Sequence, residues 1–379
     1  MNEKIQQTAH QFAQNHKEEQ AEFLRTLGKI PAPSHQEGRR AVFVRDWLLA
    51  QGAADVVIDD AQNVVCKIGP TDGELIVFAA HTDIVFPDTD PLPMAEWDGK
   101  LFAPGIGDDT ANLVNLLLCA KYLLQGNIQP KRGLLLAANS CEEGLGNLDG
   151  TKQLFQDYGG RIRAFTSFDG YMPGCTNSAV GSYRYRVTCK TMGGHSFGDW
   201  GRPNAIHILS GLIGRLYAIV PPAEAKTTYN VGSIEGGTTV NTIAQEASML
   251  YEFRSTSQAC LHKMEEEFTA AMEASRGQGW EIQVELLGVR PGDGDLDRGA
   301  LESFTRNSVE VIEAVTGEKA QVSPQSTDSN IPLSLGLPAN TIGTVRGGLA
   351  HTREEWVELD SLPVGLELAL CLVLGQIGS

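Results

Sequence analysis

In the first half of the chain, segments with the apolar pattern of buried strands alternate with segments that have the apolar spacing of helices. Short apolar runs at 75–80 and 134–138, and the largely apolar segment 164–168, predict strands that are buried on both faces of a sheet. Segments with apolar positions at helical spacing, at 5–27, 41–49 and 110–124, predict helices. Because strands and helices alternate, we expect an α/β domain with a doubly wound, largely parallel sheet and helices on both faces.

The pattern changes near residue 182. Apolar and polar residues alternate over 182–190, which predicts a half-exposed antiparallel strand. The next segments predict a helix, two strands, a helix and a strand, which completes a ferredoxin-like βαββαβ order. These segments are 205–219, 227–234, 247–253, 261–274 and 280–287.

Beyond residue 291 the α/β pattern returns, with a helix at 301–315, a strand at 339–342 and a helix at 362–374. We therefore expect an α+β domain of residues 182–291, a lid and dimerisation domain, inserted into a catalytic domain of residues 1–181 and 292–379.

Composition narrows the possible partners. With 379 residues, 42% hydrophobic and 20% charged, the chain is typical of a globular protein. A formal net charge of −17 argues against a nucleic-acid partner. The polar start and the short apolar run at 368–374 argue against a secretion signal and a membrane span. Seven cysteines without a CxxC pair argue against disulfides and cysteine zinc sites. We expect a cytoplasmic protein.

Ionisable residues follow the predicted buried strands or open a predicted helix. In open α/β sheets, ligands bind beyond the carboxyl ends of the strands, so we expect these groups to converge on one edge. The groups are His81 and Asp83, Asp108 and Asp109, Glu142 and Glu143, Asp169, and His351.

So many carboxylates in one cleft would repel one another unless cations lay between them. Imidazole and carboxylate ligands without cysteine suit zinc, and also manganese or cobalt. Two such ions ~3.5–4 Å apart, bridged by a carboxylate and a water, form a hydrolytic centre, and a nearby glutamate takes the water's proton. Each group alone has a simpler explanation, such as a helix N-cap or a solvated face. Their shared position favours the metal centre.

Five motifs in this order resemble the M20 family of zinc peptidases and amidohydrolases: HTD, GIGDD, EEGLG, FDG and AHTREEW. The resemblance implies one metal held by His81 and Asp169 and a second held by Glu143 and His351. It further implies Asp108 as the bridge, Asp83 as the residue that orients His81, and Glu142 as the general base. The choice of Asp108 over Asp109 rests on the family pattern alone.

The resemblance extends to the inserted domain. His195, in GGHS, is similar to a family histidine that, in dimeric members, reaches the partner's active site and stabilises the oxyanion. Asn241, in GGTTVNTIA, matches a position near the substrate, and Arg254, in EFRS, matches an arginine that clamps a substrate carboxylate. Gly348 belongs to the family's glycine turn. A surface histidine and a strand-edge salt bridge are the alternatives for His195 and Arg254.

We therefore predict a metal-dependent exopeptidase or amidohydrolase, a homodimer through the inserted domain, that cleaves an amide bond of a small peptide or an N-acyl amino acid. The first alternative is an N-deacylase or desuccinylase of amino acids from the same family. The second is a catalytically silent relative that binds a ligand or partner.

Overall fold

The computed structural model describes residues 2–378, which divide into two compact units. One unit comprises the described residues up to Ala179 together with those from Gly294 onward. The other spans Val180–Asp293, where the sequence predicts an insert of 182–291.

The first unit is built on an eight-stranded mixed sheet whose four central strands run parallel. The outer strand β2 is antiparallel to its neighbour β6, and β8 is antiparallel to β16. In sheet order the strands are β1 (Val56–Ile58), β2 (Val64–Ile68), β6 (Gly133–Asn139), β3 (Leu75–His81), β7 (Ile162–Phe168), β16 (Ala339–Ile342), β8 (Gly174–Thr176) and β15 (Gln321–Val322).

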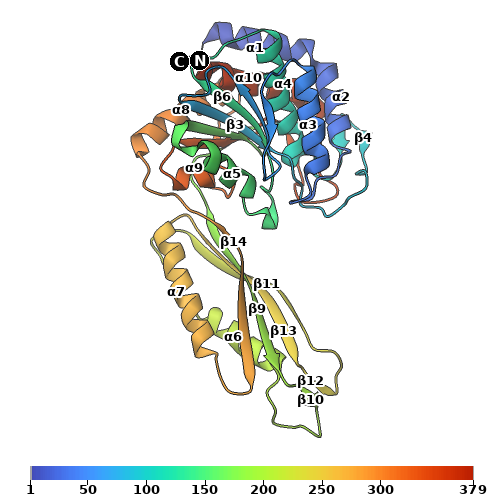
Figure 1. Ribbon diagram of the computed structural model, residues 1–379, viewed down its shortest axis with the longest axis vertical. Helices are drawn as coiled ribbons and strands as arrows, with labels where there is room; N and C mark the ends of the chain where they lie inside the picture. The colour runs from blue at the N-terminus through green and yellow to red at the C-terminus, as the bar shows by residue number, and fades with distance from the viewer. Residues whose placement is uncertain (1, 379) are drawn as a thin grey trace. The chain divides into compact units, whose positions relative to one another are not determined.

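Helices bury both faces of this sheet (Figure 1). Alternate residues of β3 enter different cores: Phe78 packs in one and Val77 in the other. All residues of β3 and β6 are buried, as their unbroken apolar runs predict. The first core contains α1 (Glu3–Asn15), α2 (Lys17–Leu27), α3 (Gly38–Ala50), α4 (Asn112–Gln125) and α10 (Leu362–Ile377), the second contains α5 (Asp149–Tyr158) and α9 (Asn330–Ser334), and α8 (Arg298–Thr316) contributes to both.

Two features of this unit differ from the sequence prediction. The single helix expected over 5–27 is two helices, because His16 leaves helical geometry (φ −114°, ψ 14°) between α1 and α2. A small antiparallel sheet was also missed, since its strands are too short to show a pattern. Its strands, in sheet order, are β17 (Gly347–Gly348), β18 (Trp356–Glu358), β5 (Lys100–Phe102) and β4 (Ala95–Trp97).

The last helix belongs to the core. The helical stretch Leu359–Ile377 has the length and apolar composition of a membrane span, but 72% of its most apolar window is buried inside the structure. It packs against α1, α4 and α8. The stretch is longer than the apolar run at 368–374, and its burial is that of a core helix.

The second unit has the predicted βαββαβ order. Its four long strands form an antiparallel sheet in the order β11-β13-β9-β14, and its two helices share one core with that sheet. Two short strands, β10 (Gly194–His195) and β12 (Thr242–Ile243), form a separate antiparallel pair. Along the chain, β10 follows β9 and β12 precedes β13. The main elements are β9 (Gly181–Thr191), α6 (Ala205–Leu216), β11 (Thr227–Gly236), β13 (Glu246–Ser255), α7 (Gln258–Ala274) and β14 (Trp280–Arg290).

Candidate metal centre

The carboxyl ends of four adjacent strands meet at one edge of the large sheet. In the parallel register, His81 at the end of β3 lies beside Asn139 at the end of β6, and Phe168 at the end of β7 lies beside Ile342 at the end of β16. Each strand therefore delivers the segment that follows it to the same edge, as the sequence predicts.

His81 is fully buried, and its two ring nitrogens have different partners. Nδ1 lies 3.1 Å from the carbonyl oxygen of Asp83, and Nε2 lies 3.1 Å from Oδ1 of Asp108. A carbonyl oxygen can only accept, so Nδ1 donates the hydrogen bond. When the ring is neutral, Nε2 is therefore the nitrogen whose lone pair is available to a metal.

Asp108 lies between two imidazoles. Its Oδ2 is 3.3 Å from Nε2 of His351, which is also 3.2 Å from Oε1 of Glu143. Donor atoms of His81, Asp108 and Asp169 all lie within 4.8 Å of one another, and so do those of Asp108, Glu143 and His351. Two overlapping groups that share one carboxylate are the arrangement that two bridged cations require.

The pKa shifts of these groups are also those expected at a site that binds cations. Burial, and then the charge of Asp108, raise the pKa of Asp169 to about 7. Burial likewise raises the pKa of Glu143. Hydrogen bonds with Asp108 and Glu143 raise the pKa of His351 to about 11. The metal-free site thus retains protons where divalent ions would take their place, and the imidazole and carboxylate donor set suits zinc, manganese or cobalt.

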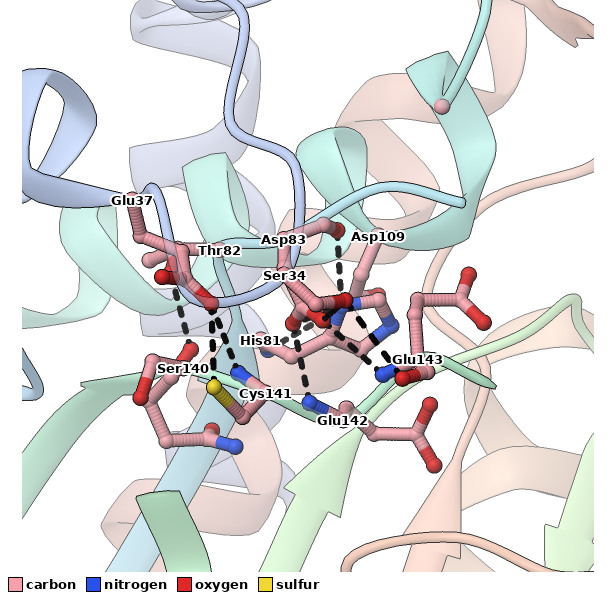
Figure 2. A network of polar contacts seen from close by, with 12 residues as sticks. Ser34, Glu37, His81, Thr82, Asp83, Asp109, Ser140, Cys141, Glu142 and Glu143 are labelled. Carbon is pink, nitrogen blue, oxygen red and sulfur yellow. Dashed lines mark hydrogen bonds and ion pairs between the residues drawn. The ribbon is translucent and has the colours of Figure 1, made fainter. Parts of the chain in front are cut away.

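One buried carboxylate, that of Asp83, holds the segment that carries the glutamate pair (Figure 2). Its Oδ1 accepts the backbone N–H of Glu142 at 2.9 Å. Its Oδ2 accepts the backbone N–H of Glu143 at 2.9 Å and the hydroxyl of Ser34 at 2.7 Å. Burial alone would raise the pKa of Asp83, but the hydrogen bond with His81 and these donors hold it below its ordinary value. Asp83 thus supports the predicted ligand His81 and the predicted base together.

Asp109 occupies a different environment from Asp108. It is fully buried, and its Oδ2 accepts the backbone N–H of His81 at 2.8 Å. Burial raises its pKa well above the ordinary value. Asp109 belongs to neither overlapping donor group. The geometry therefore supports Asp108 as the bridge, which remains a prediction.

Two buried carboxylates next to the site were missed. Glu355 accepts hydrogen bonds from the backbone that leads to Asp108, and Asp328 accepts from Asn139 and Thr151. In the sequence, Glu355 follows another glutamate and resembles a solvated pair. Its one distinguishing signal is that it directly precedes the strand residues Trp356 and Val357.

In the second unit, His195 and Asn241 lie close together. Ser196, next to His195, donates its backbone N–H to the carbonyl oxygen of Asn241 at 3.0 Å. The ring nitrogen Nδ1 of His195 accepts the backbone N–H groups of Phe197 and Gly198, both at 3.2 Å. The His195 side chain is therefore held in one orientation by its own loop.

The structure places the two remaining predicted residues in ordinary structural contacts. Arg254 donates two hydrogen bonds to the carboxylate of Glu252, at 3.0 and 3.1 Å. Gly348 pairs with Trp356 between β17 and β18. These contacts match the salt-bridge alternative for Arg254, and the substrate roles of both residues stay predictions.

Comparisons with known proteins agree with this arrangement. The model of peptidase family M20/M25/M40 matches residues 77–375. A succinyl-diaminopimelate desuccinylase from Corynebacterium glutamicum is 27% identical over 348 residues, which are 89% of this chain and 91% of that protein.

Solved structures share the fold over nearly the whole chain. A tripeptidase from Staphylococcus aureus has a TM-score of 0.75 at 21% identity, over 96% of this chain and 99% of its own. An M20 family metallo-carboxypeptidase from Sulfolobus solfataricus has a TM-score of 0.74 at 15% identity, over 94% and 98%. The comparisons confirm the predicted family, the α/β fold class and a hydrolase that acts on amide bonds. The family implies the use of divalent metal, for which the two donor groups provide candidate ligands.

Proposed function

Because the chain belongs to peptidase family M20/M25/M40, we propose that it is a two-zinc amide hydrolase with Glu142 as its general base. The observation that carries the proposal is the position of Asp108, whose two oxygens face the Nε2 atoms of His81 and His351 at 3.1 and 3.3 Å. His81 and Asp169 would hold one ion, Glu143 and His351 the other, and Asp108 both.

The roles of the chain's own groups follow from this arrangement. Two bound cations would lower the pKa of the attacking water and polarise the amide carbonyl. Glu142 takes the proton of that water and passes it to the leaving amine. Donor atoms of Glu142, His81 and Glu143 lie within 4.8 Å of one another, so the base stands beside the ligands. Asp83 fixes the Glu142 backbone and thereby limits the positions of its carboxylate.

His195 is suited to stabilise negative charge on the substrate. Because its Nδ1 accepts two backbone N–H groups, a neutral imidazole must carry its proton on Nε2. The ring then presents one N–H donor, and its side chain is exposed. We propose that this donor binds the oxyanion that forms when water attacks the amide.

We also propose a homodimer through the second unit, in which His195 serves the partner's centre. The strands β11 and β14 each have a neighbour on one side only in the sheet order. Both carry exposed apolar side chains, namely Ile234 on β11 and Val284 and Leu286 on β14. Long edge strands of this kind are ready to pair with another chain. Light scattering tests the proposal, and a monomer at working concentration would contradict it.

Two substrate classes fit the proposal: a small peptide with a free carboxylate, and an N-acyl amino acid. Similarity to a desuccinylase favours the N-acyl amino acid. Panels of dipeptides, tripeptides, N-acetyl and N-succinyl amino acids, offered to the zinc-loaded protein, separate them. Turnover of acylated single amino acids alone would identify the protein as a deacylase. If no panel were turned over and Glu142→Gln changed no property, the protein would instead be a binding protein.

A cytoplasmic location is part of the proposal. All seven cysteines are buried as free thiols, which is usual in a reducing compartment. Cell fractionation tests it, and recovery of the protein from a secreted fraction would contradict it.

A further inference from the structure

We propose that Glu355 is a positioning residue that fixes the orientation of Asp108 through the backbone of residues 105–108. The inference rests on the two-cation centre proposed above. Glu355 is fully buried, and its carboxylate accepts from the peptide groups on the way to Asp108 and from that of Asp108 itself. The N–H groups of Gly105, Gly107 and Asp108 lie at 2.9, 2.8 and 2.7 Å from its oxygens.

The partners of Glu355 require a carboxylate at this position. The fourth partner is the hydroxyl of Tyr171, 3.2 Å from Oε1. All four partners donate, and an ionised carboxylate offers only acceptors. Burial, and then the charge of Asp108, raise the pKa of Glu355 to about 7, so a second acid beside Asp108 is electrostatically unfavourable. Hydrogen bonds to an ionised group are strong enough to offset part of that cost.

Tyr171 packs against the same loop, next to the Glu355 carboxylate. A side chain at Gly107 would bring its Cβ within 2.7 Å of the Tyr171 ring, and one at Gly347 within 2.5 Å of the same ring. The ring thus fills the space that these two glycines leave. The loop of Asp108 therefore packs against the Tyr171 ring and is hydrogen-bonded to the Glu355 carboxylate.

Glu355 also ties together the two chain segments that bring ligands to the second cation position. Its carbonyl oxygen accepts the backbone N–H of Ala103 at 3.1 Å, next to β5, and the strand that follows it, β18, pairs with β5. Asp108 follows β5, and His351 precedes β18. The side chain and the backbone of one residue therefore set the distance between the bridge and His351.

The test is Glu355→Gln, which keeps the side chain's size and replaces one acceptor with a donor. Removing such a partner of a ligand typically weakens metal binding by about 10–100-fold. We expect that loss for zinc and manganese, measured by competition with a chelator. The matched control is Glu354→Gln, at the exposed neighbouring residue, which should leave the affinity unchanged.

A structural role alone would lower the unfolding temperature of the metal-free protein and leave the affinity of the folded protein intact. A positioning role also changes the magnetic coupling between two bound manganese ions, which electron paramagnetic resonance detects. Folded Glu355→Gln with unchanged affinity and coupling would overturn the proposal.

Should that variant fail to fold, Tyr171→Phe decides, because it removes one of the four donors and keeps the ring. We expect its affinity to fall by a few-fold, and an unchanged affinity would overturn the inference. A wild-type chain that binds no cations would refute the proposed function instead, so the two failures are distinct.

Discussion

At the scale of single residues, neighbours in the sequence have different surroundings. Asp108 lies between two imidazoles, whereas Asp109 accepts a backbone N–H and is sealed from solvent. Glu354 is exposed, whereas Glu355 is buried among donors. Sequence could locate most of the candidate ligands because they follow buried strands, and Asp108 because it opens a helix. It could not separate Glu355 from its neighbour, since burial there depends on a loop about 250 residues away in the chain.

The glutamate pair gives the first prediction. Glu142→Gln should keep both metals and reduce kcat by about 10²–10⁴-fold, because the variant retains its backbone anchor and loses only the base. Glu143→Ala should lose one metal, because it removes a ligand of the second group. Elemental analysis beside initial rates measures both effects. Equal metal loss in the two variants would refute the division of roles.

The second prediction concerns protons. In the metal-free protein His351, with a pKa of about 11, is charged at neutral pH, and Asp169, with a pKa of about 7, is partly protonated. Both must lose a proton to become ligands, so metal affinity should rise with pH. Well above pH 7, Asp169 has already lost its proton and should release none on metal binding, whereas His351 should still release one. Calorimetry in buffers of different ionisation enthalpy counts these protons, and a release independent of pH would contradict the assignment.

At the scale of elements, prediction succeeded where the local sequence carries the signal. The strands β3 and β6 are unbroken apolar runs, and the alternation of β9 gives buried Tyr183 and Tyr185. The break between α1 and α2 was missed because apolar positions at helical spacing flank it on both sides, and the polar residues 14–20 between them include no glycine or proline. The short strands β5 and β18 were missed because pairing, rather than pattern, defines them.

The packing of α10 gives the third prediction. A methyl group at Gly365 would overlap the carbonyl oxygen of Thr344, whose N–H is held by Asn112. Asn112 in turn donates to the carbonyl oxygens of Gly107 and Gly170, beside two predicted ligands. We expect Gly365→Ala to destabilise the protein by about 1–3 kcal/mol or more and to weaken metal binding.

The control for that variant lies in the same helix. A Cβ at Gly375 meets nothing within 4 Å, so Gly375→Ala should be neutral or stabilise the helix by up to about 1 kcal/mol. Denaturant unfolding measures both variants. Equal effects at the two positions would show that helix propensity, rather than contact with Thr344, governs this part of α10.

At the scale of the whole molecule, the proposed dimer gives the fourth prediction. His195→Ala and Glu142→Gln should each be nearly inactive, but co-expressed chains should regain activity if His195 acts across the dimer. In a mixed dimer, the active site that has an intact Glu142 is then completed by the intact His195 of the other chain. No recovery in isolated mixed dimers would place His195 in the service of its own chain.

The insertion of the second unit into the first also affects the order in which the centre can form. During synthesis, His81, Asp108 and Asp169 have all emerged before the second unit begins at Val180. His351 and Glu355 emerge only after that unit is complete. The proposed donor group of the first ion is therefore complete on a partly made chain, and the proposed group of the second ion waits for the segment that carries His351. On the proposed assignment, a chain that stops before His351 has the donor group for one ion and lacks a ligand of the second.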